Sequence, residues 1–133
     1  KYFSYPLEPF IQTMREYIYG HLVPIANHWS KLINLGIVWP EKLNEFLNTN
    51  AAAVQLRPTP LMLRYQQGDY NCLHQDKYSE HYFPFQALIL LSVPGQDFEG
   101  EEFTLEENRP RQQSRASVVP LQQGQLLIFP NQF

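Results

Sequence analysis

The hydrophobic period of the chain changes at Arg57-Pro58-Thr59-Pro60, and this change limits the folds that the sequence can adopt. Two prolines in three residues cannot continue a helix, so one kind of structure ends there. Before the break, apolar residues recur at helical spacing. A first helix is predicted from Leu7 to Ile18, and Gly20 is expected to end it. Two further helices are predicted from Ile25 to Ile33 and from Pro40 to Leu47.

Short apolar segments bounded by turn residues follow the break. A hairpin is expected from Leu61–Tyr65 and Tyr70–His74 around the turn at 66–69. Further strands are expected at 85–93, 102–105, 116–119 and 125–129, and the polar segment 106–114 is expected to be an exposed loop. Closely spaced short strands favour a sandwich or barrel over a parallel sheet. The predicted class is therefore α+β, with helices in 1–57 and strands in 58–133 of a single domain.

Composition excludes several functional classes. The 133 residues suit one domain, and 44% hydrophobic residues supply enough apolar material for a core. A net charge of -3 excludes a strongly basic nucleic-acid-binding body, although it allows a local basic groove. A lone cysteine, no leader at Lys1-Tyr2-Phe3 and no apolar run near the ~20 residues of a membrane helix indicate a reducing cytoplasm as the default.

The stretch "YNCLHQDKYSEH", residues 70 to 81, concentrates ligand-type side chains. If it ends a strand, His74 and Asp76 share one face, about 7 Å apart along the backbone at ~3.3 Å per residue. An imidazole and a carboxylate are two ligands of the 2-His-1-carboxylate triad of non-haem iron(II). The alternative is a polar strand end. We expect Cys72 to be a small buried hydrophobe and His81 to lie in a loop.

Three segments in order carry a resemblance to a known superfamily. "LRYQQGDYNCLHQD", "LILLSVPGQDFEGEEFTL" and "VVPLQQGQLLIFPN" resemble, in turn, the iron-site entry, the "F-x-G-G-E-F" element and the "P-x-x-G-x-x-x-x-F" hairpin of the prolyl-hydroxylase-like 2-oxoglutarate-dependent oxygenases. The helical start, "LEPFIQTMREYIYGHLVPIANHW", is similar to a bacterial family of oxygenases proposed to act on damaged, methylated DNA. The resemblance covers nearly the whole chain.

The resemblance implies a fold, a site and a reaction. The fold would be a double-stranded β-helix, incomplete at its C-terminus, with helices packed on it. His74 and Asp76 would bind iron(II), and Tyr65, with Tyr70 as a second candidate, would bond the 2-oxoglutarate carboxylate. Tyr65 is equally well explained as a core aromatic of the hairpin. With O2, such a site would hydroxylate a substrate C–H bond, and on a methylated base this would release formaldehyde.

The chain also departs from the superfamily pattern. No histidine follows His81, so the late histidine ligand and the basic residue after it that would bind the far carboxylate of 2-oxoglutarate are not placed. We therefore expect these residues to be part of a longer protein. Glu101 stands at the second glycine position of the "G-G-E-F" element, where a turn of positive φ would be strained.

Two charged clusters allow alternatives. Acidic residues at 99, 101, 102, 106 and 107 lack the spacing of a calcium loop and favour a solvated turn. Arg109, Arg111 and Arg115 form a basic patch that suits either a solvated loop or the phosphates of a nucleic acid. Two other functions stay open, a prolyl-hydroxylase-like protein hydroxylase and a catalytically silent barrel that binds a ligand or partner.

Overall fold

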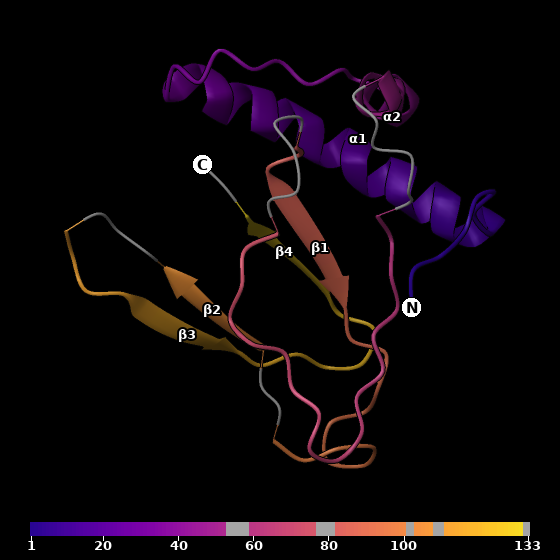
Figure 1. Cartoon of the computed structure of the whole chain (residues 1–133), viewed down its shortest axis with the longest axis vertical. Helices are drawn as coiled ribbons and strands as arrows, with labels where there is room; N and C mark the ends of the chain where they lie inside the picture. The colour runs from indigo at the N-terminus through magenta and orange to yellow at the C-terminus, as the bar shows by residue number, and fades with distance from the viewer. Residues whose placement is uncertain (53–58, 77–81, 101–102, 108–110, 132–133) are drawn as a thin grey trace. The chain divides into compact units, whose positions relative to one another are not determined.

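The computed structural model describes residues 1–52, 59–76, 82–100, 103–107 and 111–131 (Figure 1). The chain divides into two compact units. The first comprises residues 1–70, 77–85 and 130–133, and the second comprises residues 71–76 and 86–129. Both helices lie in the first unit, whereas β2, β3 and most of β1 and β4 lie in the second.

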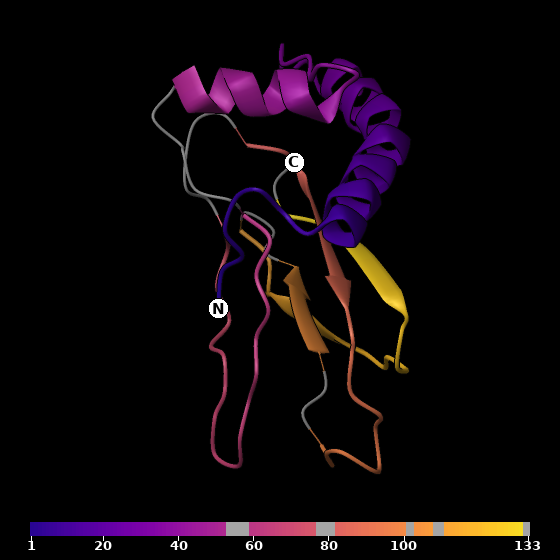
Figure 2. The same cartoon turned by 90° about the vertical axis from the view of Figure 1, so that its right-hand side faces the viewer.

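Helix α1 (Pro9–Leu32) is a single helix where the sequence predicted two, so the stop predicted at Gly20 is wrong (Figure 2). Pro9 stands at the first position, and the Glu8 side chain accepts a hydrogen bond from the Phe10 backbone N–H at 3.0 Å. The helix continues because one buried face spans the predicted stop and extends into the second predicted segment: Tyr19, Leu22, Val23, Ala26 and Ser30. Packing of that face outweighs the propensity cost of Gly20 and Pro24, which are both exposed.

Helix α2 (Leu43–Ala52) starts three residues after the predicted Pro40. Its predicted apolar face is confirmed, since Leu43 is buried and Phe46 and Leu47 are half-buried. The proline break is only partly described, because residues 53–58 lie outside the described residues.

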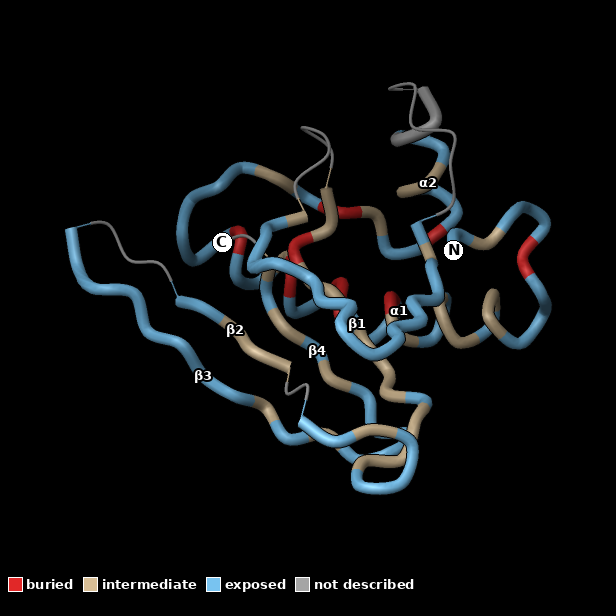
Figure 3. The backbone as a smooth tube through the Cα atoms, turned by 60° about the horizontal axis from the view of Figure 1, so that its bottom comes forward, coloured by how far each residue is buried: buried red, intermediate tan, exposed pale blue. Residues whose placement is uncertain are grey.

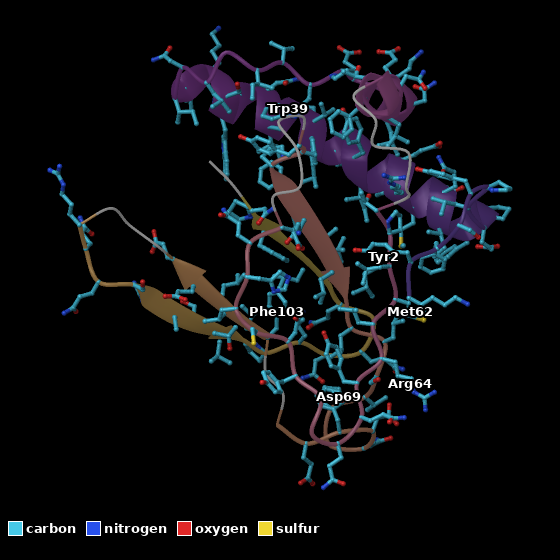
Figure 4. All side chains as sticks on the ribbon, viewed as in Figure 1. Tyr2, Trp39, Met62, Arg64, Asp69 and Phe103 are labelled. Carbon is cyan, nitrogen blue, oxygen red and sulfur yellow. The ribbon has the colours of Figure 1, made fainter. Side chains whose placement is uncertain are left out.

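Trp39 is part of the buried core of the first unit (Figure 4). The Asn27 side chain forms two hydrogen bonds with the Trp39 backbone. It donates to the Trp39 carbonyl at 3.0 Å and accepts from the Trp39 N–H at 2.8 Å. The Trp39 ring N–H donates to the Tyr82 carbonyl at 2.6 Å. Around it pack Tyr19, Val23, Ala26 and Leu43, with Ile37, Phe46, Leu47, Phe83 and Phe85. Polar groups that enter this core are therefore hydrogen-bonded, as burial requires.

The described strands form two two-stranded sheets. Strand β1 (Phe85–Ile89) pairs with β4 (Leu126–Pro130), and hydrogen bonds between Pro84 and Asn131 and between Leu90 and Gln125 flank the pair. Strand β2 (Phe103–Glu107) pairs antiparallel with β3 (Arg115–Val119). Strands β2, β3 and β4 match predicted strands to within two residues at each end. Strand β1 starts at the predicted Phe85 but ends four residues before the predicted Val93. The double-stranded β-helix stays a prediction.

The predicted strand pair at 61–74 is wrong, although its turn is confirmed. The Asp69 N–H donates to the Gln66 carbonyl at 2.9 Å, and an Asp69 carboxylate oxygen accepts from the Gln66 N–H at 2.8 Å. The two arms do not pair as strands, and Leu61 instead forms an isolated bridge with Tyr2. Residues 61–70 are all exposed, so no buried face holds the two arms in register.

No helix in the described part of the chain is long and apolar enough to cross a membrane.

Candidate functional site

His74 and Asp76 face each other in the second unit. His74 Nε2 lies 3.4 Å from Asp76 Oδ1, which confirms that the two side chains come together, although not on a strand. His74 is exposed and Asp76 half-buried, so solutes can reach the pair. The arrangement places one nitrogen and one oxygen donor side by side.

Each of the two side chains is oriented by a second group. His74 Nδ1 lies 2.7 Å from the Cys72 carbonyl oxygen, a partner that can only accept. Nδ1 therefore carries a proton, and Nε2 is the ring nitrogen that faces Asp76 and could bind a metal ion. Gln86 Nε2 donates to Asp76 Oδ2 at 2.6 Å, while the other oxygen, Oδ1, faces the imidazole. Such outer partners are typical of metal-binding histidines and carboxylates.

The pair fits a divalent metal ion. Ligand bonds of about 2.1 Å at a right angle place two donor atoms about 3.0 Å apart. The observed 3.4 Å requires only a few tenths of an ångström of adjustment or a slightly wider angle. Two ligands leave most of a six-coordinate shell for co-substrates and other groups, and among the described residues no group of three or more metal-ligating side chains occurs.

Gln86 is a site residue that the sequence reasoning missed. It lies in β1, ten residues beyond Asp76, and its side chain is half-buried. The sequence carried one signal for this role, because Gln86 is the only polar residue in the otherwise apolar run from Phe83 to Leu91. A polar side chain in an apolar strand requires a hydrogen-bond partner.

The predicted co-substrate residues are both exposed. Tyr65 is 43% exposed and Tyr70 is 81% exposed, so the alternative of a core aromatic at Tyr65 is wrong. Both belong to the first unit, whereas His74 and Asp76 belong to the second. Their role toward 2-oxoglutarate stays a prediction.

Cys72 is exposed, and the prediction of a buried hydrophobe is wrong. Its position in an irregular segment explains this, because no strand turns its side chain inward. The carbonyl of the same residue orients His74, so its contribution to the site comes from its backbone.

Other predicted residues are surface groups or lie outside the described residues. His21 and His28 are exposed on α1, and His21 Nδ1 lies 2.9 Å from the Tyr17 carbonyl oxygen. Arg111 and Arg115 are exposed, as are Glu99, Glu106 and Glu107. His81, Glu101, Glu102 and Arg109 lie outside the described residues.

Comparison with known proteins identifies relatives. A family model, Oxygenase-NA, described as an oxygenase catalysing oxidative methylation of damaged DNA, matches residues 1–133. Two uncharacterized proteins, from two strains of Mycobacterium tuberculosis, are each 42% identical over 127 residues. The matches cover 96% of this chain and 54% of each relative, so the chain spans about half of their length. No solved structure matches the chain significantly.

Proposed function

The chain belongs to the Oxygenase-NA family, and from this premise we propose that it is part of an iron(II)- and 2-oxoglutarate-dependent oxygenase that oxidatively demethylates damaged DNA. The observation that carries the proposal is the opposed pair of His74 Nε2 and Asp76 Oδ1, each held by its own partner. A nitrogen and a carboxylate oxygen with open neighbouring positions are the donors that non-haem iron oxygenases use. The proposed fold around them is a double-stranded β-helix.

The residues of the chain would hold and orient the reacting groups. His74 and Asp76 would bind the metal, and the Cys72 carbonyl and Gln86 would keep the donor atoms aimed at it. Tyr65, or Tyr70 in its place, would donate its hydroxyl to a 2-oxoglutarate carboxylate. Iron(II) and 2-oxoglutarate, when bound, would supply the oxidation: one atom of O2 would enter the substrate methyl group and the other would enter succinate, carbon dioxide would leave, and the hydroxymethyl group would depart as formaldehyde.

The third ligand of the proposed site has no counterpart in this sequence after His81. Because the relatives are nearly twice as long as their matched part, the experiment is designed for the full-length protein.

The proposal is tested by replacing the pair in the full-length protein. His74→Ala and Asp76→Ala each remove a ligand, so binding of iron(II), measured by anaerobic titration calorimetry, is expected to weaken by about a hundredfold or more. Succinate formation in the presence of a methylated oligonucleotide is expected to be lost. The control is His28→Ala, an exposed histidine of α1, which is expected to keep both properties. Iron binding of wild-type strength in the His74→Ala and Asp76→Ala proteins contradicts the proposal.

A further inference from the structure

The β2–β3 pair and the described residues that follow its distal end form an exposed ribbon, here defined as Phe103–Glu107 and 111–119. The strands pair from Phe103↔Val119 at one end to Glu107↔Arg115 at the other. The Phe103 ring packs on Phe129 of β4, with ring centroids 5.3 Å apart. At ~3.3 Å per residue, the Arg115 end lies about 13 Å along the strands from this anchor. Figures 1 and 3 show it pointing away from β1 and β4.

The distal part of the ribbon is solvated on both faces. Residues 115–118 of β3 are exposed, as are Glu106 and Glu107 of β2, while the anchored residues are half-buried. In the described part of the chain, neither strand pairs with a third. A two-stranded sheet without a covering layer gains little stability of its own. The ribbon therefore suits contact with a partner better than it suits a core.

Two guanidinium groups at the distal end are available to a partner. Arg111, in the turn with φ 61°, and Arg115, at the start of β3, are exposed. In the described structure, no ion pair or side-chain hydrogen bond holds either of them. Phosphate groups are the ligands that exposed arginines bind with the best geometry and charge match.

The same end carries groups that can read base edges. Gln112 and Gln113 line a recess with Glu107 and Arg115, of about 190 Å³. This is smaller than the ~300–1,000 Å³ typical of small-molecule sites, so an enclosed ligand is disfavoured. The two glutamines carry neutral amides, which a site for phosphate alone would not require. Such amides match the adenine edge in the major groove, and that groove admits a two-stranded ribbon.

We propose that the ribbon enters the major groove of duplex DNA, with Arg111 and Arg115 on backbone phosphates and Gln112 and Gln113 on base edges. This inference rests on the proposed function, since damaged DNA is the substrate named for the family. It adds the element that binds the duplex and the form of nucleic acid that is bound. The role of the ribbon is binding, separate from the chemistry at His74 and Asp76.

The test measures binding of a fluorescein-labelled methylated duplex to the full-length protein by anisotropy over a range of salt concentrations. The double replacement Arg111→Gln and Arg115→Gln is expected to weaken binding by about tenfold and to lower the salt slope by about two, one for each lost phosphate contact. The matched control, Lys31→Gln with Lys42→Gln, removes the same charge from two exposed positions of the first unit. It is expected to bind like the wild type.

Each other outcome overturns the inference in a recognisable way. A ribbon variant that binds with the affinity and salt slope of the control removes the ribbon from the interface while leaving the proposed function in place. Equal weakening on the matching single strand overturns entry into a major groove. Wild-type protein that does not bind the duplex overturns both the inference and the DNA substrate. The His74→Ala protein is expected to keep duplex binding, so a failure of the iron chemistry alone does not affect this test.

Discussion

Among single residues, Gln86 is a partner that orients the carboxylate of Asp76. It donates to Oδ2 at 2.6 Å, and the other oxygen lies 3.4 Å from His74 Nε2. A carboxylate can rotate about its last torsion at little cost, so the position of Oδ1 depends on what holds Oδ2. Gln86 is therefore a positioning residue of the proposed metal site.

Replacement of Gln86 tests this role. In Gln86→Ala, iron(II) affinity is expected to fall by about 10- to 100-fold, since an outer partner of a ligand has been removed. Gln86→Glu keeps the size but loses the donor, and it is expected to weaken the affinity as well. The control is Gln96→Ala, an exposed glutamine of the turn after β1. Anaerobic titration of the full-length protein measures all three, and wild-type affinity in both Gln86 variants would remove this residue from the site.

The site was predictable from sequence only where its parts are neighbours in the chain. His74 and Asp76 are two residues apart, and their pairing follows from spacing. Gln86 is ten residues from Asp76, and its contact depends on where β1 begins. Cys72 acts through its carbonyl, a group that every residue type carries. Residue identity could not predict that contact.

At the scale of elements, burial decided which predictions were confirmed. The apolar face of α1 extends through Gly20 and Pro24 because Tyr19, Val23 and Ala26 all enter one core. The lower helix propensity of Gly20 costs only about 1 kcal/mol, and the free energy gained by burying these side chains in one core is larger. The arms at 61–74 have alternating residues but bury none of residues 61–70, so the predicted pairing has no hydrophobic gain to stabilise it.

Two glycine replacements test the continuity of α1. Gly20 is exposed within the helix, and a Cβ there would meet nothing within 4 Å. Gly20→Ala is therefore expected to raise the free energy of unfolding by about 1 kcal/mol. Gly36 follows the helix with φ +75°, where an L side chain is strained, so Gly36→Ala is expected to lower it by about 1 kcal/mol. Urea unfolding followed by circular dichroism measures both, and a destabilised Gly20→Ala protein would mean that the helix ends there.

At the scale of the whole molecule, the buried apolar side chains belong to the first unit. They are Leu7, Tyr19, Leu22, Val23, Ala26, Trp39 and Leu43 among the described residues. Residues of the strands in the second unit are half-buried or exposed. Their alternating apolar and polar side chains therefore predicted the strands, but not which elements pack over the faces of the sheets. The predicted barrel depends on such coverage, so the sequence pattern alone could not establish it.

Tyr19 makes the stability of this core depend on alkaline pH. It is 5% exposed, its hydroxyl donates to the Pro40 carbonyl at 2.6 Å, and burial, with the nearby Glu45 carboxylate, raises its pKa to about 12. An unfolded tyrosine titrates near pH ~10, so the folded state holds the proton more tightly. Its contribution to stability is therefore complete below pH ~10 and is lost as the pH rises toward about 12.

Replacement by phenylalanine removes this dependence. Tyr19→Phe is expected to cost about 1 kcal/mol at neutral pH, for the lost hydrogen bond, and to make the decline in stability between pH ~10 and ~12 shallower than in the wild type. Tyr17→Phe, at an exposed position of the same helix, is expected to keep the wild-type decline, because Tyr17 is 67% exposed and is not part of the core. Urea unfolding at a series of pH values compares the three proteins. Since the wild type and Tyr19→Phe differ in no other titrating group, an equally steep decline in Tyr19→Phe would exclude Tyr19 as its source.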